Sequence, residues 1–144
     1  PAIIHQSGEK HFEELKASYK ESGIKADCRA YLDHIEKLYE WADLVIARAG
    51  ALTVSEFSAA GIPSILVPFP FAVDNHQFYN AKYLSDKKAA RLIIQGELTT
   101  ESLSSILRSM TRNECLKMSK AALENKATKP EEVIYKACER LINK

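Results

Sequence analysis

The chain has 144 residues, of which 46% are hydrophobic and 27% are charged. This apolar content is enough to bury a core, and it excludes a disordered tail. The 20 lysines and arginines nearly balance the 19 aspartates and glutamates, giving a net charge of +1, so we expect no nucleic-acid partner held by a basic field. The longest apolar stretch, residues 64–73, contains two prolines and is shorter than the roughly 20 residues that span a bilayer.

Short runs rich in β-branched residues alternate with segments of helical periodicity over the first two thirds of the chain. That alternation is typical of a parallel sheet covered by helices. Strands are predicted at residues 2–5, 27–32, 44–48, 64–68 and 90–94. Helices are predicted between them at residues 9–22, 35–41, 52–60 and 75–85. The sequence therefore predicts an α/β fold with one Rossmann-like, doubly wound parallel sheet of five strands.

Only helical patterns follow residue 95. They cover residues 99–110, 114–125 and 131–143, the last beginning just after Pro130, which is typical of a helix start. We therefore predict a single domain over residues 1–144, with a sheet region at 1–95 and C-terminal helices at 96–144. Because the chain starts at Pro1 directly in a strand-like run, with no initiator Met and no signal-peptide pattern, we expect it to be a piece of a longer protein.

Several common types of site are not indicated. Cys28, Cys115 and Cys138 are widely spaced with no CxxC pattern, so they predict buried free thiols in a reducing compartment and neither disulfides nor a zinc knuckle. Neither GxGxxG nor GxxxxGK[ST] occurs, which argues against a dinucleotide and a P-loop ATPase. Ser55 is not in a GxSxG turn, and no metal-ligand spacing is present, so no cofactor and no metal are expected.

The loop after residue 48 is the first candidate for binding. In open α/β sheets, ligands bind beyond the carboxyl ends of the strands. Small residues at 49–51 allow a tight turn, and the free N–H groups at the start of the next helix offer a site for an anion. Glu56 comes one turn after Thr53 and suits a sugar diol. An equally good interpretation is that Glu56 only complements the helix N-terminus.

The loop after residue 68 is the second candidate. Its prolines favour an extended course, and Asp74 or Asn75 can cap the helix that follows. His76, Gln77 and Asn80 then bring hydrogen-bonding groups to the first turns of that helix, which suits a polyhydroxylated ligand. The alternative is that Asp74 and Asn75 are only caps and that His76 is only a surface residue.

These segments together resemble the MurG family of bacterial peptidoglycan glycosyltransferases. The resemblance rests on residues 42–56 (ADLVIARAGALTVSE), 59–63 (AAGIP), 67–70 (VPFP) and 74–77 (DNHQ), on Asn80 with Ala81, and on residues 5–8 (HQSG) and 31–33 (YLD). It covers roughly residues 3–95. The helical tail is compatible with the family but carries no diagnostic motif.

The resemblance implies that the chain is most of the C-terminal, donor-nucleotide-binding half of a two-domain GT-B glycosyltransferase. Such an enzyme transfers N-acetylglucosamine from UDP-N-acetylglucosamine to lipid I, making lipid II. The acceptor would be held by an N-terminal domain outside this chain, and the first strand and Gly-rich loop of the C-terminal domain would also lie outside it. The intact enzyme would be a peripheral protein at the cytoplasmic face of the bacterial inner membrane, and the fragment alone would be soluble and inactive.

The resemblance also assigns roles to individual residues. Glu56 would accept hydrogen bonds from both ribose hydroxyls, and Leu32 would contact uracil through its backbone. The substrate-binding residues implied for UDP-N-acetylglucosamine are Leu32, Ala51, Leu52, Thr53, Glu56, His76, Gln77 and Asn80. Residues 51–53 would contact the diphosphate and sugar, His76 and Gln77 the sugar or ribose hydroxyls, and Asn80 would support that region.

The implied chemistry is a direct inverting displacement at the anomeric carbon, without a covalent intermediate or a metal. No catalytic residue is assigned within this chain, and the general base is expected elsewhere. The alternatives are another UDP-sugar transferase or a UDP-N-acetylglucosamine epimerase of the same fold, or a nucleotide-binding module without catalysis.

Overall fold

The computed structural model describes residues 1–125, 135, 136, 138 and 139. The chain divides into two compact units, Pro1–Tyr39 and Glu40–Lys144. The helix predicted over residues 131–143 lies largely outside the described residues, although the four that are described there are helical.

The first unit is built around a parallel pair of strands, β1 (Ile4–Gln6) and β2 (Asp27–Arg29). A 3₁₀ turn (Glu9–His11) and α1 (Phe12–Glu21) connect them, as a parallel connection requires. The pairing continues just past the strands, where the Ser7 and Gly8 N–H groups donate to the Arg29 and Ala30 carbonyls. No residue between 1 and 39 is fully buried. The following helix, α2 (Ile35–Trp41), runs from this unit into the next.

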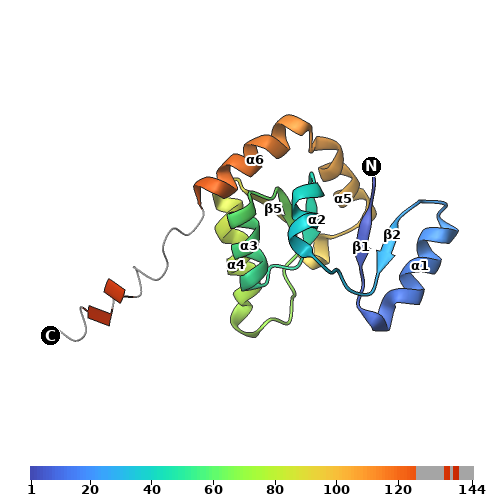
Figure 1. The fold of residues 1–144 in the computed structure, drawn as a ribbon, viewed down its shortest axis with the longest axis horizontal. Coiled ribbons are helices and arrows are strands. Elements are labelled where there is room, and N and C mark those ends of the chain that lie inside the picture. Colours follow the sequence, from blue (N-terminus) through green and yellow to red (C-terminus); the bar gives the residue numbers. More distant parts are fainter. Residues whose placement is uncertain (126–134, 137, 140–144) are drawn as a thin grey trace. The chain divides into compact units, whose positions relative to one another are not determined.

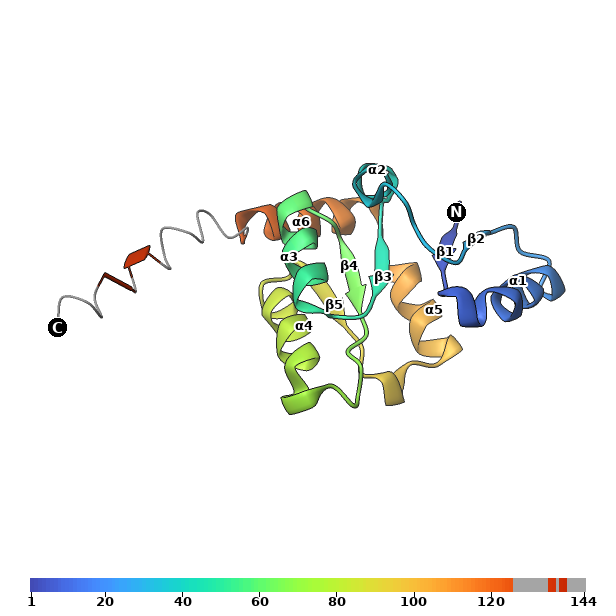
Figure 2. The same cartoon turned by 60° about the horizontal axis from the view of Figure 1, so that its bottom comes forward.

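The second unit contains a parallel sheet in the order β3 (Val45–Ala47), β4 (Ser64–Leu66) and β5 (Ala90–Leu92). Two crossover helices, α3 (Ala51–Ala60) and α4 (His76–Asp86), lie side by side along one side of this sheet (Figures 1 and 2). Beyond β5 come α5 (Thr100–Ser109), on the other side of the sheet, and α6 (Arg112–Glu124), which packs on α3 (Figure 2).

The core of the second unit centres on β4. Every residue of this strand is buried, including Ile65 and Leu66 at 0% exposure. A strand that is buried along its whole length, as β4 is from Ser64 to Leu66, is expected when helices cover both faces of a parallel sheet. Around it pack buried side chains from α3, α4 and α6: Val54, Phe57, Ala81, Leu84, Met118 and Ala122.

The predicted α/β class and the predicted elements agree closely with the structure. All five strands form where they were expected, and the described helices begin and end within three residues of their predicted limits. The hydrogen bonds, however, join the strands into two sheets and not into the one five-stranded layer expected. Alternation of strands and helices predicts parallel crossovers but does not say which strands are neighbours. That residues 1–144 form a single domain remains a prediction.

α3 ends at a glycine that sits against α6. Gly61 has φ 69° and ψ 38°, a left-handed conformation that other residues adopt only with strain. A Cβ atom placed on Gly61 would lie 2.8 Å from Cγ of Leu123, which is inside normal contact distance. The glycine therefore serves both the helix end and the close approach of α6.

We expect Gly61→Ala to lower the free energy of unfolding by about 2 kcal/mol, with roughly half from the left-handed backbone and the rest from the contact with Leu123. Chemical denaturation measures the free energy of unfolding of Gly61→Ala, of Leu123→Ala and of the double variant Gly61→Ala/Leu123→Ala. The half-exposed Leu123 can be shortened at small cost, so the double variant should recover the contact part only. A loss below about 0.5 kcal/mol in Gly61→Ala would contradict the packing described.

Candidate functional site

The register of the second sheet brings two loops to one edge. Ala47 of β3 is paired with Leu66 of β4, and Leu66 is paired with Leu92 of β5. Because all three strands are parallel, their carboxyl ends lie together, and the loops at residues 48–50 and 67–75 leave the sheet at the same edge. This is the edge at which open α/β sheets bind ligands.

The first loop ends in the exposed start of α3. Gly50 is the N-cap residue, and it provides no side-chain hydrogen bond to the first turn. The first helical bond runs from the Val54 N–H to the Gly50 carbonyl, at 3.0 Å. The N–H groups of residues 51–53 precede it, and Leu52 is 79% exposed. Such N–H groups and the helix dipole together attract an anion.

Two further predicted residues lie on the first turns of α3. The Thr53 Oγ1 atom lies 3.5 Å from the position of a Cβ on Gly50, an ordinary contact distance, so this hydroxyl lies beside the N-cap. Glu56 is exposed and follows Thr53 by three residues, which places both on one side of the helix. From this position the Glu56 carboxylate can either accept hydrogen bonds from a ribose diol or complement the dipole of α3.

The second loop is closed by hydrogen bonds from the start of α4. The Phe69 N–H donates to Gln77 Oε1 at 2.9 Å, which identifies that atom as the amide oxygen. His76 Nδ1 lies 2.8 Å from the Val73 carbonyl. A carbonyl only accepts, so Nδ1 carries the proton and Nε2 of a neutral ring is an acceptor.

The prediction that Asp74 or Asn75 caps α4 through its side chain is wrong. Asn75 occupies the N-cap position, but its side chain makes no capping hydrogen bond. Both residues have a left-handed backbone, with φ of 51° and 52°, whereas a side-chain cap requires an extended one. Asp and Asn tolerate this conformation better than most residues, so their place in the sequence serves the turn.

Asn80 connects the second candidate segment to the first. Its Nδ2 donates to the Ala49 carbonyl at 3.0 Å, and Ala49 itself is fully buried. The supporting role expected for Asn80 is consistent with this bond, because the side chain holds the loop that leads into α3. Direct contact of Asn80 with a ligand remains a prediction.

The sequence analysis assigned no role to Arg48, the first residue after β3. Its Nη1 donates to the carbonyls of Val67 and Pro68, at 3.2 and 3.3 Å. The guanidinium carbon also lies 5.7 Å from the centre of the Phe69 ring. The only feature of the sequence that could have indicated a role for Arg48 is its position as a lone arginine between a strand and a run of small residues.

Leu32 belongs to the first unit, whereas the remaining predicted site residues belong to the second. It lies three residues beyond β2, which ends at Arg29 and is shorter than the predicted strand at residues 27–32. Its N–H donates to Gln6 Oε1 at 3.2 Å. The acceptor of the Leu32 N–H is thus a side chain of β1 and not a backbone carbonyl of that strand. Any backbone contact of Leu32 with a base would then use its carbonyl.

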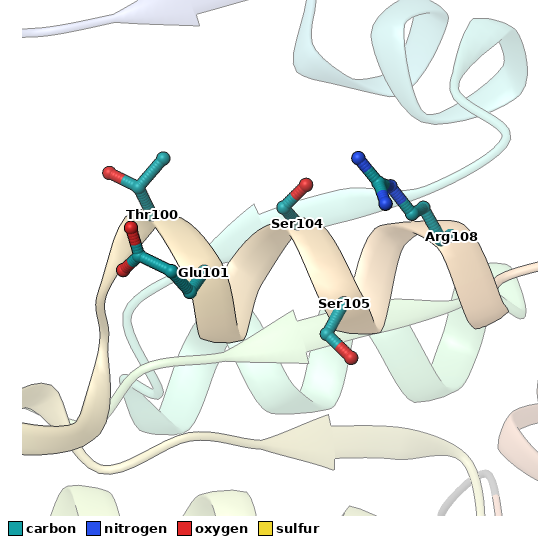
Figure 3. Close-up of a pocket in the computed structure, with 5 residues that line it drawn as sticks. All are labelled: Thr100, Glu101, Ser104, Ser105 and Arg108. Atoms are coloured by element: carbon teal, nitrogen blue, oxygen red, sulfur yellow. The ribbon is translucent and has the colours of Figure 1, made fainter.

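A hollow of about 460 Å³ lies along α5, away from the predicted residues. It is lined by Thr100, Glu101, Ser104, Ser105 and Arg108, all on this helix (Figure 3). Thr99 and Ser102 already cap the start of α5 with reciprocal hydrogen bonds. The start of α5 thus has side-chain caps, whereas the start of α3 has none.

The cysteines agree only in part with the prediction of buried free thiols. Cys28 and Cys115 are free and half-buried, whereas Cys138 is exposed, so burial was wrong for Cys138. Burial raises the pKa of the Cys115 thiol, and Asp43 and Glu114 act in the same direction. Within the described part of the chain, no group of three or more His, Cys, Asp or Glu residues could hold a metal, and no helix is long and apolar enough to cross a bilayer.

The geometry and the sequence comparisons define the class of protein. The sequence profile of the glycosyltransferase family 28 C-terminal domain matches residues 2–134, and the chain belongs to this family. A crystal structure of MurG from Acinetobacter baumannii matches 96% of the chain with a TM-score of 0.88 and 32% identity. The fold is thus that of the C-terminal half of a GT-B glycosyltransferase, and the predicted resemblance to the MurG family is confirmed.

Two similar relatives carry the same enzyme name. The UDP-N-acetylglucosamine–N-acetylmuramyl-(pentapeptide) pyrophosphoryl-undecaprenol N-acetylglucosamine transferase of Dechloromonas aromatica is 45% identical over 98% of this chain. The protein of the same name from Nitrosospira multiformis is 49% identical over 86% of it. The chain spans 40% and 35% of these two relatives, and 43% of the Acinetobacter protein.

The hydrogen bond between Phe69 and Gln77 can be tested without a ligand. Gln77→Glu keeps an oxygen for the Phe69 N–H, whereas Gln77→Met removes it. We expect amide hydrogen exchange at Phe69 to stay slow in Gln77→Glu and to become about fivefold to tenfold faster in Gln77→Met, since one such bond contributes about 1 kcal/mol. Equal exchange rates in the two variants would show that Gln77 does not hold this loop.

Proposed function

We propose that this chain is the donor-binding part of an enzyme that transfers N-acetylglucosamine from UDP-N-acetylglucosamine to lipid I, forming lipid II for peptidoglycan. The observation that carries the proposal is the meeting of three features at one sheet edge. These are the open N-terminus of α3, the carboxylate of Glu56 one turn further on, and the polar first turn of α4. The relatives carry a name that states this transfer.

The diphosphate and the ribose of the donor each have a matching group in this arrangement. The diphosphate binds at the N–H groups of residues 51–53, with the Thr53 hydroxyl beside it. Glu56 accepts from the two ribose hydroxyls, because a carboxylate offers two acceptors to a diol. For uracil we propose a backbone contact with Leu32, a residue of the first unit, through its carbonyl, because its N–H is bonded to Gln6.

The sugar contacts follow from bonds already made within the protein. Gln77 uses its oxygen on Phe69, so its NH₂ group is the part that donates to a sugar hydroxyl. His76 uses Nδ1 on Val73, so Nε2 accepts from a hydroxyl. The second loop thus presents both donors and an acceptor, which suits N-acetylglucosamine.

The transfer itself is an inverting displacement. A hydroxyl of the lipid I sugar attacks C1 of N-acetylglucosamine, the bond from C1 to the diphosphate oxygen breaks, and UDP leaves. The proton of the attacking hydroxyl passes to a base outside this chain. The N–H groups at the start of α3 stabilise the negative charge that grows on the departing diphosphate, and they are already oriented before reaction.

The remaining partners belong to the parts of the relatives that this chain does not span. Lipid I binds there, and the same parts bring the enzyme to the cytoplasmic face of the inner membrane as a peripheral protein. The other functions considered from the sequence, a different UDP-sugar transferase, an epimerase and a binding module without catalysis, are not favoured by the relatives' names.

A chemical-shift titration of the chain with UDP-N-acetylglucosamine tests the proposal, with GDP-mannose as the control ligand. We expect saturable shifts at Leu32, at residues 51–56 and at residues 76–80 with the uridine ligand alone. The titration is repeated with the chain extended to the length of its relatives, so that every donor-binding segment is present. Silence in the extended protein, or equal shifts with both ligands, would overturn the proposed function.

Removing the Glu56 carboxylate should weaken donor binding through the ribose. We expect Glu56→Ala to raise the Kd for UDP by roughly 100-fold or more, because two hydrogen bonds to a charged group, each contributing at least about 1.5 kcal/mol, are lost. The matched control is the ligand: 2′,3′-dideoxy-UDP has no diol and should bind both proteins equally. Calorimetry measures both. An unchanged Kd for UDP would leave Glu56 as a partner of the helix dipole only.

A further inference from the structure

The two ligand loops are joined by bonds that run in opposite directions. From the end of β3, Arg48 reaches the carbonyls of Val67 and Pro68, which follow β4 directly. From α4, Asn80 reaches back to the carbonyl of Ala49, the neighbour of Arg48. The loop at 48–50 is therefore tied to the β4–α4 segment at both of that segment's ends.

The Arg48 end of this connection depends on the shape of the guanidinium group. One N–H-bearing nitrogen lies between two successive carbonyls, while the flat group lies near the face of Phe69, 5.7 Å from the ring centre. Carbonyls at a strand end need partners, and arginine can bond to them while stacking on an aromatic ring. Lysine carries the same charge but lacks the planar group.

What Arg48 holds is connected directly to the second ligand loop. Phe69, under the guanidinium, is the residue whose N–H binds Gln77 at 2.9 Å. Its carbonyl accepts from the Ala72 N–H, and the Ala72 carbonyl accepts from the Asn75 N–H. The position of residues 67–69 therefore sets the start of α4, which carries His76 and Gln77.

We propose that Arg48 is a positioning residue that fixes the sugar-binding loop relative to the diphosphate-binding start of α3. It acts through Val67, Pro68 and Phe69. This inference rests on the proposed function only for the identity of the ligand. The two loops bind different parts of one donor, so a loop that moves independently costs affinity for the whole donor more than affinity for its nucleotide part.

The test compares Arg48→Met and Arg48→Lys, with Arg108→Met on α5 as the matched control. The first measurement needs no ligand: amide hydrogen exchange at Phe69, Ala72 and Asn75. We expect about tenfold faster exchange in Arg48→Met, an intermediate value in Arg48→Lys and no change in the control. Thermal unfolding of each variant shows whether the rest of the unit stays folded, and Arg48→Lys serves if Arg48→Met does not fold.

The second measurement separates positioning from direct binding, using the chain extended to the length of its relatives. For Arg48→Met we expect the Kd for UDP-N-acetylglucosamine to rise about tenfold and the Kd for UDP to change less than about threefold. Equal losses for both ligands would make Arg48 a diphosphate ligand and overturn the proposal, as would unchanged exchange in the loop. If the unsubstituted protein binds neither ligand, the proposed function fails and the exchange measurement alone decides the role of Arg48.

Discussion

The pairing of β3, β4 and β5 in parallel register is the constraint on which the candidate site depends. Ala47, Leu66 and Leu92 end their strands side by side, so the loops that follow them share one edge. Burial of the whole of β4 holds this register, because a shift by one residue would exchange the side chains facing α3 and α4 for those facing α5. The packing of an aliphatic core thus determines where the polar groups of the candidate site lie.

Some polar side-chain atoms at this edge form hydrogen bonds within the protein, and others are left to face outward. Gln77 and His76 each use one side-chain atom to fix the second loop, which leaves the opposite atom of each with a defined chemical character. Asn80 and Arg48 are turned inward onto backbone carbonyls. The site is therefore organised before any ligand arrives, and its residues fall into those that hold the loops and those that face outward.

The first unit has a different balance. Its two strands and α1 bury no residue fully, and Leu32, for which we propose the contact with uracil, donates its N–H to Gln6. A stretch of 39 residues is too small to build a deep core from one strand pair and one helix. The second unit, in contrast, surrounds β4 with three helices that contribute buried side chains. Stability of the candidate site accordingly resides in the packing of the second unit.

The sequence by itself determined the elements and most of the candidate site. Alternating β-branched runs and helical periods gave the strands and helices, since those patterns reflect local geometry and burial on one face. The spacing of small residues before Leu52, and the place of Glu56 one turn later, predicted an open helix start because both are local features of a single turn. The motifs around residues 42–80 carried the family resemblance for the same reason.

Only the tertiary structure decided how these pieces are joined. Which strands are neighbours, the left-handed turn at Asp74 and Asn75, and the bonds from Arg48 and Asn80 all depend on partners 19 to 31 residues away or on backbone angles that several sequences share. Arg48 looked unremarkable in the sequence because its acceptors are backbone carbonyls, which every residue possesses. The carbonyls of Val67 and Pro68 can accept from Arg48 because of where β4 ends, and the packing around Ile65 and Leu66 determines that position.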